Sequence, residues 1–418
     1  MKVLVVGSGG REHVICWKLK QSKRVSELYC CPGNGGIASV ATCVDIKATD
    51  VDKIVEYASS NNFDLVFVAP EDPLALGLVD KLNENGIRAF GPKANAAIIE
   101  ASKVFSKNLM AKYHIPTAEY ALFDNKEKAY DYLEGCEMPI VIKADGLALG
   151  KGVIIAKDID EAKAAVSSML EDKAFGDAGS NIVIEECMVG PELTILAFSD
   201  GKYAIPMISS RDHKRAYDHD EGLNTGGMGA VTPGADLSDD DVKVISDTII
   251  QPTIEALKSE GRPFKGVIYF GLMLTKKGPK VIEYNCRFGD PEVQAILPLL
   301  ENDFMDVIDA VIDGKLSTYK LSWKNKKSCV VVMASGGYPV KYEKGYEISG
   351  IDTCGKLVFQ AGTKLTDDGK IVTNGGRVLC VYDEADSLDN AIDGAYEGVK
   401  KISFKDMHYR TDIGRTLG

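Results

Sequence analysis

The first hundred residues alternate short apolar runs with stretches of helical spacing. Apolar strands that alternate with helices indicate βαβ units, in which helices cover both faces of a parallel sheet. We therefore predict a doubly wound, Rossmann-like α/β domain over residues 1–102. The predicted strands are residues 2–6, 65–69 and 87–90, and the predicted helices are residues 11–21 and 51–60.

Apolar residues then recur at helical spacing from residue 94 to residue 113. Ile98, Phe105 and Leu109 follow this spacing, and the stretch ends before Pro116. The repeat predicts one helix, and the boundary of the first domain lies within it, near Lys103.

The middle of the chain contains apolar strands in pairs. Gly-rich or polar turns separate the members of each pair, which favours antiparallel hairpins over further βαβ units. We predict an α+β domain over residues 103–322 and a small α+β C-terminal domain over residues 323–418. The pairs are residues 139–143 with 152–157, 181–185 with 193–200, and 266–275 with 280–284; the last domain has strands at 328–334, 356–360 and 377–381 and a helix at 387–402.

Composition narrows the function classes. A chain of 418 residues is too long for one ordinary core, and its net charge of -12 argues against a nucleic-acid partner while leaving room for a local phosphate pocket. No run approaches the roughly 20 apolar residues that span a bilayer, and no signal-peptide pattern is present. Ten cysteines without a CxxC pair favour a reducing compartment. We expect a cytoplasmic protein that binds neither nucleic acid nor membrane.

Three polar or Gly-rich loops follow strands of the first domain, at residues 7–12, 32–36 and 70–73. The sequence GSGGRE at 7–12 opens a helix, so its amides could hold a phosphate, although a tight turn without a ligand is the alternative. A dinucleotide is disfavoured because Glu12 stands where a third glycine belongs and residues 28–32 offer no acid for a ribose. Because such sheets bind ligands at their carboxyl edge, we predict a phosphorylated small molecule there. The candidate contacts are Gly9, Gly10, Arg11, Glu12, Gly33, Asn34, Gly35 and Glu71.

Two segments of the middle region suit a nucleotide. Residues 141–153 form a strand, a Gly-containing loop and a second strand, and Lys143 and Lys151 suit triphosphate oxygens, although an ordinary hairpin explains the pattern equally well. Residues 184–192 carry three carboxylates between two strands. This is expected of a hinge that meets adenine and ribose, and also of a solvated acidic turn.

Residues 281–292 are the most informative segment. In an extended strand Glu283, Asn285 and Arg287 share one face because side chains alternate. Two oxygen ligands and a guanidinium on one face are typical of a site that joins Mg²⁺, phosphates and an anionic transition state. An exposed polar strand face explains the alternation as well, but it does not explain the turn at 287–292.

The long polar region from residue 209 to residue 233 is predicted as a substrate loop. Loops of this length inside compact enzymes are usually functional or disordered. The region holds Asp212, His213 and a glycine cluster at 224–229. We interpret His213 as structural or as a phosphate contact rather than a base, because no nucleophile motif lies near it.

Taken in order, the motifs resemble the ATP-grasp superfamily and, within it, the phosphoribosylamine-glycine ligase family. The matching segments cover essentially the whole chain: GSGGREH at 7–13, PGNGG at 32–36, VIKADGLALGKGV at 141–153, RDHKR at 211–215, NTGGMG at 224–229, EYNCRFGDPE at 283–292, ASGGYP at 334–339, AGTK at 361–364 and NGGRVL at 374–379. The resemblance implies a phosphoribosylamine-binding N-terminal domain, a two-lobed ATP-grasp domain and a small C-terminal domain. We also expect the lobe of about residues 120–190 to close over ATP.

The resemblance also implies roles for individual residues. Those for ATP are Lys103, Lys143, Gly150, Lys151, Gly152, Glu185, Glu186, Met188, Val189 and Glu192; those for Mg²⁺ or Mn²⁺ are Glu283 and Asn285; those for the acceptor are Asp212, Asn224, Thr225, Gly226, Gly227, Met228, Gly229, Arg287 and Asp290. Arg287, Asp212 and Lys143 would act in catalysis. The segment at 269–274 lacks the second metal-binding acid that many ATP-grasp enzymes place there.

The implied activity is ATP-dependent ligation of glycine to 5-phosphoribosylamine through glycyl phosphate, in a monomer or weak homodimer. Three alternatives stay open at this point. One is another ATP-grasp ligase, such as a biotin carboxylase-like enzyme, and one is a nucleotide-binding regulatory protein without turnover. The third, an NAD-dependent oxidoreductase, is weakened by the acid missing after the second strand.

Overall fold

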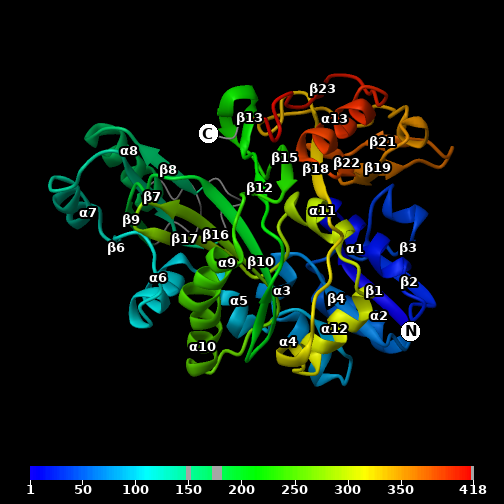
Figure 1. The fold of residues 1–418 in the computed structure, drawn as a ribbon, viewed down its shortest axis with the longest axis horizontal. Helices are drawn as coiled ribbons and strands as arrows, with labels where there is room; N and C mark the ends of the chain where they lie inside the picture. The colour runs from blue at the N-terminus through cyan, green and yellow to red at the C-terminus, as the bar shows by residue number, and fades with distance from the viewer. Residues whose placement is uncertain (147–151, 172–180, 416–418) are drawn as a thin grey trace.

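A parallel sheet with helices on both faces forms the N-terminal domain (Figure 1). The computed structural model describes residues 1–146, 152–171 and 181–415. Its first elements are β1 (Lys2–Gly7), α1 (Gly10–Lys20), β2 (Glu27–Pro32), η1 (Ile37–Ser39), β3 (Thr42–Cys43), α2 (Val51–Ser60), β4 (Leu65–Val68), α3 (Glu71–Ala75), α4 (Leu78–Glu84) and β5 (Ala89–Phe90). The strand order is β3-β2-β1-β4-β5, and every pairing is parallel.

The two faces of this sheet belong to different hydrophobic clusters. Leu4 of β1 packs in one cluster with Ile54 of α2. Val5, which points to the opposite face, packs in another cluster with Val14 of α1. The predicted doubly wound fold is therefore confirmed.

The helix predicted over residues 94–113 is two helices, α5 (Ala94–Ala101) and α6 (Lys103–Lys112). Ser102 between them has an extended backbone, with φ -134° and ψ 113°, and its Oγ accepts a hydrogen bond from the Phe105 amide at 3.0 Å. A serine N-cap satisfies a first-turn amide and so starts a new helix. The prediction of one continuous helix was wrong, and the break places Lys103 in the first turn of α6.

The central region contains two four-stranded sheets, one in a protruding lobe and one in the body. The lobe elements are β6 (Tyr120–Phe123), α7 (Lys126–Leu133), β7 (Ile140–Ala144), β8 (Val153–Ala156), α8 (Ile159–Leu170) and β9 (Ile182–Glu186). The body elements are β10 (Glu192–Asp200), β11 (Ala204–Pro206), α9 (Asp239–Ile245), η4 (Ser246–Ile250), α10 (Gln251–Ser259), β16 (Lys265–Thr275), β17 (Gly278–Asn285), α11 (Glu292–Ile296), η5 (Leu297–Leu299), α12 (Phe304–Ile312) and η6 (Leu316–Thr318). The lobe order is β6-β9-β7-β8 and the body order is β11-β10-β16-β17.

Two of the three predicted hairpins are present, as β7 with β8 and β16 with β17. The third is wrong, because β9 and β10 belong to different sheets. Gly190 lies between them with φ 156°, and a Cβ there would approach the Leu274 carbonyl oxygen to 2.3 Å. Glycine thus lets the chain pass close over β16 as it leaves the lobe.

The C-terminal sheet has the order β12-β15-β18-β22-β19, with β23 paired to β18. Its elements and those around it are β12 (Arg211–Asp212), β13 (Arg215–Tyr217), η3 (Asp218–Asp220), β14 (Glu221–Asn224), β15 (Gly229–Thr232), β18 (Lys327–Ser335), η7 (Ile351–Thr353), β19 (Leu357–Gln360), β20 (Thr363–Leu365), β21 (Ile371–Thr373), β22 (Arg377–Ala385), α13 (Leu388–Val399) and β23 (Met407–His408). The polar region at 209–233, predicted as a loop, therefore holds four short strands. Two of them, β12 and β15, extend the C-terminal sheet.

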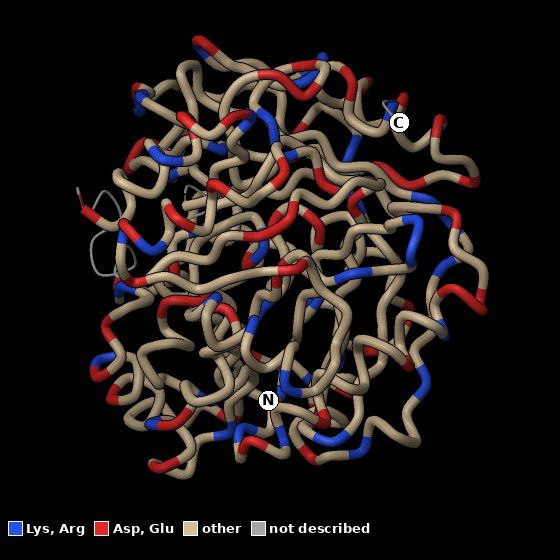
Figure 2. The backbone as a smooth tube through the Cα atoms, turned by 90° about the vertical axis from the view of Figure 1, so that its left-hand side faces the viewer, with Lys and Arg blue, Asp and Glu red and all other residues tan. Residues whose placement is uncertain are grey.

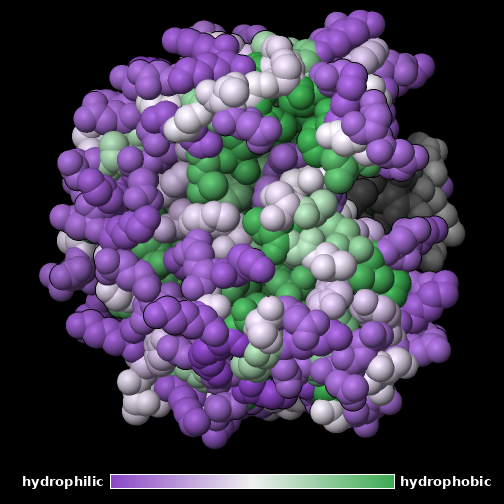
Figure 3. All heavy atoms as spheres, turned by 90° about the vertical axis from the view of Figure 1, so that its right-hand side faces the viewer, coloured by the Kyte–Doolittle hydropathy of each residue, from purple (hydrophilic) through white to green (hydrophobic). Residues whose placement is uncertain are grey.

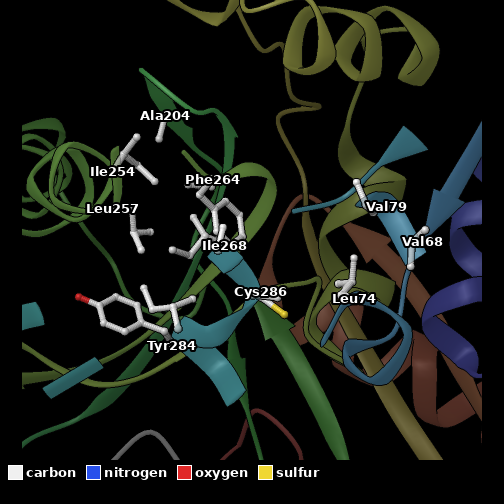
Figure 4. Packing of buried hydrophobic residues seen from close by; sticks show 14 of the residues in the cluster. Val68, Leu74, Val79, Ala204, Ile254, Leu257, Phe264, Ile268, Tyr284 and Cys286 are labelled. Atoms are coloured by element: carbon white, nitrogen blue, oxygen red, sulfur yellow. The ribbon is translucent and has the colours of Figure 1, made fainter. Parts of the chain in front are cut away.

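The lobe has a hydrophobic core of its own, whereas the rest of the molecule shares cores between domains. The lobe cluster includes Leu133, Ile142 and Ile184. A second cluster runs from the N-terminal sheet into the body, where Phe264, Ile268 and Tyr284 lie (Figure 4). The lobe is therefore built as a separate rigid unit on a fused body.

Charges of both signs are interspersed along the backbone (Figure 2). On the face formed by the N- and C-terminal domains, hydrophobic side chains show mainly between hydrophilic ones (Figure 3). Among the described residues, no helix has the length and apolarity needed to cross a bilayer.

Candidate active site

The candidate site is organised around the end of β17. Glu283 and Asn285 alternate with Tyr284, whose hydroxyl points the other way and lies 3.0 Å from Thr253 Oγ1. Gly271 of β16 pairs with Glu283, and a Cβ at Gly271 would lie 3.1 Å from Glu283 Cγ. The missing side chain at Gly271 therefore leaves space for the Glu283 carboxylate.

Four cations surround the Glu283 carboxylate. Lys214 Nζ lies 3.5 Å from Glu283 Oε1. Lys214 chiefly, with Lys143, Lys103 and Arg287, lowers the pKa of Glu283 against the opposing effect of burial. The carboxylate is therefore ionised, and the lysines and the arginine around it are cations of the kind that bind triphosphate oxygens.

Arg287, predicted to share the face of Glu283, lies just beyond the end of β17. Its guanidinium bridges two acids, with Nε 3.0 Å from Glu71 Oε2 and Nη2 3.0 Å from Glu100 Oε1. Burial opposes the ionisation of Glu71, but Arg287 and Arg11 outweigh it and lower its pKa to about 2. Glu100 was not predicted; its side chain is 7% exposed and reaches Arg287 from α5.

A small pocket lies beside Lys214. Its lining includes Glu192, Asp212, Lys214, Tyr269 and Glu283. Burial raises the pKa of Asp212, and the neighbouring Glu192 and Glu283 add to this effect against the opposing Lys214. The pocket therefore combines two cations, Arg211 and Lys214, with three acids, and the acids suit an ammonium or amine group as well as a metal.

The Glu292 carboxyl lies close to this group, in the first turn of α11. Burial, and then the charge of Asp212, raises its pKa to about 7. The raised pKa of a buried acid is a feature of functional sites. Glu292 belongs to the motif at 283–292, but the sequence indicated no role for it.

Lysines of the lobe and of α6 meet at Glu185. Lys143 Nζ lies 3.0 Å from Glu185 Oε2 and donates to the Ile282 carbonyl at 3.1 Å. Lys107 Nζ lies 3.2 Å from Glu185 Oε1, and burial lowers the pKa of Lys107 to about 8. Lys107 was missed, although it follows Lys103 by one helical turn and so shares its face of α6.

Lys103 lies at the edge of the phosphate-binding loop predicted from the sequence. Its Nζ donates to the Gly146 carbonyl at 2.8 Å. Gly152 is buried, while Gly150 and Lys151 lie outside the described residues.

The predicted hinge residues lie between the lobe and the body. Glu186 Oε1 is 2.6 Å from Lys280 Nζ, and Val189 is 83% exposed. Met188 is half-buried, and Glu192 Oε2 lies 3.8 Å from Lys214 Nζ. The segment is therefore accessible from solvent, as contact with a nucleotide base requires.

The N-terminal glycine loop is closed by its own helix. The amides of Ser8 and Gly9 donate to Glu12 Oε2, and Arg11 Nε lies 2.6 Å from Glu12 Oε1. A Cβ on Gly10 would lie 2.6 Å from Gln294 Nε2. The amides expected to bind a phosphate thus already have an anionic partner.

The second N-terminal loop faces the C-terminal domain. Asn34 Nδ2 donates to the carbonyls of Ser8 and Gln360, each at 2.8 Å. The Gly35 amide donates to the Thr363 carbonyl at 3.3 Å, and Gly33 has φ 74°. This loop therefore joins the first domain to the last.

Asp290 lies where all three domains meet. The Arg11 amide donates to Asp290 Oδ2 at 3.3 Å. Arg377, from the C-terminal domain, donates from Nη1 to the carbonyls of Asp290 at 2.7 Å and Gly226 at 2.8 Å. Arg377 was missed because it lies 87 residues from Asp290 and 151 residues from Gly226. It holds two predicted acceptor segments together.

The remaining predicted acceptor residues lie along the same segment. The Thr225 amide donates to the Lys214 carbonyl at 2.7 Å, and Gly227 has φ 113°. Asn224 is exposed, Met228 is buried and Gly229 opens β15.

His213 faces away from the pocket. Its Nε2 accepts a hydrogen bond from the Gly414 amide at 3.1 Å. Burial, aided by Arg211 and Arg410, lowers its pKa to about 4. A neutral, buried imidazole with this hydrogen-bond partner supports a structural role for His213 rather than the role of a base.

The donor set at Glu283 and Asn285 fits a hard divalent cation. Both offer oxygen ligands on one strand face, and among the described residues no hydrogen bond occupies the Glu283 carboxylate. No group of three or more His, Cys, Asp or Glu side chains suited to a metal occurs in the described part of the chain. A metal here would therefore take its other ligands from phosphate and water.

Family models match nearly the whole chain. They are the N domain of phosphoribosylglycinamide synthetase over residues 1–100, its ATP-grasp (A) domain over residues 101–293 and its C domain over residues 328–416.

Several relatives are similar over their full length. The phosphoribosylamine--glycine ligase of Caldanaerobacter subterraneus subsp. tengcongensis is 48% identical over 414 residues, covering 99% of each chain. That of Clostridium acetobutylicum is 46% identical and covers 100% of each. The crystal structure of the Thermotoga maritima enzyme is 33% identical, with a TM-score of 0.88, over 99% of this chain and 100% of that chain.

A biotin carboxylase from Campylobacter jejuni has a TM-score of 0.74 but only 14% identity, over 98% of this chain and 93% of that chain, so it shares the fold alone. The chain belongs to the phosphoribosylamine-glycine ligase (phosphoribosylglycinamide synthetase) family of ATP-grasp enzymes.

Proposed function

We propose that the chain joins glycine to 5-phosphoribosylamine, consuming ATP and giving glycinamide ribonucleotide, ADP and phosphate. Full-length similarity to enzymes of that name supports the reaction. The observation that carries it is the Glu283 carboxylate among Lys214, Lys143 and Lys103, where the lobe meets the body. Such a cluster is the arrangement expected for holding a triphosphate beside a carboxylate substrate.

In the first step, a glycine carboxylate oxygen attacks the γ-phosphorus of ATP. The bond to the β–γ bridging oxygen breaks, ADP leaves and glycyl phosphate forms. Lys143, Lys103 and Arg287 spread the negative charge that develops on the phosphoryl oxygens. We further propose that Gly150, Lys151 and Gly152 contact the phosphates of ATP, that Glu185 to Val189 contact the adenine, and that Glu192 contacts the ribose.

Glu283 and Asn285 would hold Mg²⁺ or Mn²⁺. When bound, the ion neutralises phosphate charge and orients the triphosphate for in-line transfer. Glu283 is suited to this because its carboxylate is ionised and accepts no hydrogen bond from the described residues.

In the second step, the amine nitrogen of 5-phosphoribosylamine attacks the carbonyl carbon of glycyl phosphate. The bond between this carbon and the phosphate oxygen breaks, and the proton that the nitrogen loses as the amide forms ends on the departing phosphate. Asp212 orients the amine from the Lys214 pocket, and Asp290 with residues 224–229 lines the acceptor site. Gly9 to Glu12, Gly33 to Gly35 and Glu71 border it from the N-terminal domain.

Water must be kept out between the two steps, because it would hydrolyse the acyl phosphate. We propose that the lobe of about residues 120–190 closes over the nucleotide to do this. Its separate hydrophobic core supports a rigid-body movement. We further propose domain limits of 1–102, 103–322 and 323–418.

We also propose that the enzyme works in the cytoplasm as a monomer or weak homodimer, without nucleic acid or membrane. The acidic charge of -12 and the absence of a disulfide-type cysteine pattern in the sequence support this. Sedimentation velocity over a range of concentrations tests the oligomeric state.

Phosphate release with ATP, glycine and freshly prepared 5-phosphoribosylamine tests the reaction. We expect release that depends on all three substrates and stops when any one is omitted. Release with ATP and bicarbonate, but not glycine, would instead indicate a carboxylase. Tight ATP binding without release under any condition would indicate a regulatory protein.

A further inference from the structure

The segment at 408–414 contacts the hairpin of β13 and β14, which follows Lys214 in the sequence. Arg410 Nη1 donates to Asp220 Oδ1 at 2.7 Å and to the Arg215 carbonyl at 3.2 Å. The Thr411 amide donates to Asp218 Oδ1 at 2.8 Å. β13, β14 and η3 are thus fastened to residues that are distant in sequence, at the top of the molecule (Figure 1).

The guanidinium of Arg410 is held rigidly. Its side chain is 0% exposed, and it makes a bidentate contact with Asp412, from Nε to Oδ1 at 2.7 Å and from Nη2 to Oδ2 at 2.8 Å. Paired N–H donors facing a carboxylate fix both distance and angle. Arg410 therefore presents Nη1 to the hairpin from a fixed position.

The turn beneath Arg410 has an unfavourable backbone. His219 and Asp220 have φ of 60° and 55°, values that residues other than glycine adopt infrequently. The His219 amide donates to Asp412 Oδ2 at 2.8 Å, and Asp220 forms an ion pair with Arg410. Such conformations persist where surrounding contacts enforce them. Here those contacts come from the 408–414 segment.

The segment from β12 to β13, which precedes the turn, connects this contact to the pocket. Asp212 and Lys214 line the pocket, whereas His213 between them faces away from it. On that opposite side the Gly414 amide donates to His213 Nε2. Ala216 is held as well, because its carbonyl lies 2.7 Å from His408 Nε2. Residues 408–414 therefore form hydrogen bonds with residues on either side of Lys214 but do not line the pocket.

We propose that residues 408–414 form a strap that positions Lys214 and Asp212 for the transfer steps, with Arg410 as its central positioning residue. The proposal rests on the proposed function, because it assigns these two side chains a part in the reaction. A displacement of about 1 Å in a reacting group can cost about 100-fold in rate. The strap sets their position from another domain.

The test uses matched variants of the full-length enzyme. Asp220→Gly removes the carboxylate that Arg410 contacts and still permits the positive φ, and Asp220 is 62% exposed, so the fold should survive. Glu221→Gly is the control, since Glu221 is the exposed acid next in sequence and its side chain forms no hydrogen bond or ion pair with the described strap. Arg410→Lys keeps the charge but loses the bidentate contact with Asp412.

We expect kcat to fall at least about tenfold in Asp220→Gly and Arg410→Lys, with a smaller change in the KM for ATP and a melting temperature near that of the parent. Arg410→Lys should retain more activity than Arg410→Met. Unchanged kcat in Asp220→Gly, an equal fall in Glu221→Gly, or losses that match the unfolded fraction would overturn the strap.

Hydrogen–deuterium exchange separates this proposal from the proposed function. If the parent releases no phosphate, the proposed function fails, but exchange at residues 211–216 still tests the strap. Faster exchange there in Asp220→Gly, and not in Glu221→Gly, supports it. Equal exchange in both variants and the parent overturns it.

Discussion

Glu283 concentrates the chemistry of the site in one side chain. Its carboxylate is ionised, lies 3.5 Å from Lys214 and is not engaged by a hydrogen bond from the described residues. We predict that Glu283→Ala lowers ligation by at least about 100-fold, because the divalent ion that Glu283 would hold no longer neutralises charge on the transferring phosphoryl group. Phosphate release measures the effect, and circular dichroism checks the fold. Near-normal turnover would remove Glu283 from the metal site.

Glu292 gives the protein a pH dependence that can be isolated. Burial and Asp212 raise its pKa from 4.5 to about 7. The folded protein then keeps a proton that the unfolded chain loses, so the stability contributed by Glu292 falls as pH rises from about 4.5 to about 7. Above about 7 the loss is complete.

Glu292→Gln, which is neutral at every pH, should therefore gain stability relative to the parent between pH 5 and pH 8. Denaturant unfolding of both proteins at the two values measures the difference. Glu343→Gln, at an exposed position of the C-terminal domain, should show no such change. A constant difference between parent and Glu292→Gln would contradict the assignment.

At the scale of the element, the pairing of β16 with β17 sets the position of Glu283. Gly271 leaves room for its Cγ, because a Cβ added at Gly271 would lie only 3.1 Å from that atom. We predict that Gly271→Ala lowers kcat about tenfold while stability changes little, because the carboxylate must shift by a few tenths of an ångström. Gly135→Ala, where a Cβ would have its nearest neighbour at 3.7 Å, is the control. Equal rates for both variants would show that the spacing is not critical.

Elements defined by local pattern could be predicted from the sequence. The alternation of β17 and the first βαβ units depend on neighbouring residues, and both are present. The separation of β9 from β10 could not be predicted, because strand pairing is decided by distant partners. Arg377 and Arg410 were missed for the same reason, since Arg377 reaches Asp290 across 87 residues and Arg410 reaches Asp220 across 190 residues. Ser102 was a local signal for the break between α5 and α6 that the apolar repeat concealed.

At the scale of the whole molecule, a separate lobe core on a fused body predicts a hinge motion. We expect small-angle scattering to show a smaller radius of gyration when a non-hydrolysable ATP analogue and Mg²⁺ are added. Closure would bring the lobe toward the body and exclude water. The ligand-free protein and the protein with Mg²⁺ alone serve as references. An unchanged radius at saturating analogue would contradict closure.

The lobe joins the body at only two crossings, one before β6 and one after β9, and this has a consequence for protein engineering. A lobe from another nucleotide clamp would need only two splice points to be grafted onto this scaffold. The compatibility condition is electrostatic, because Lys107 of the recipient lies 3.2 Å from Glu185 of the lobe, and both side chains are buried. A donor lacking an acid at that place would leave an unpaired ammonium inside the chimera.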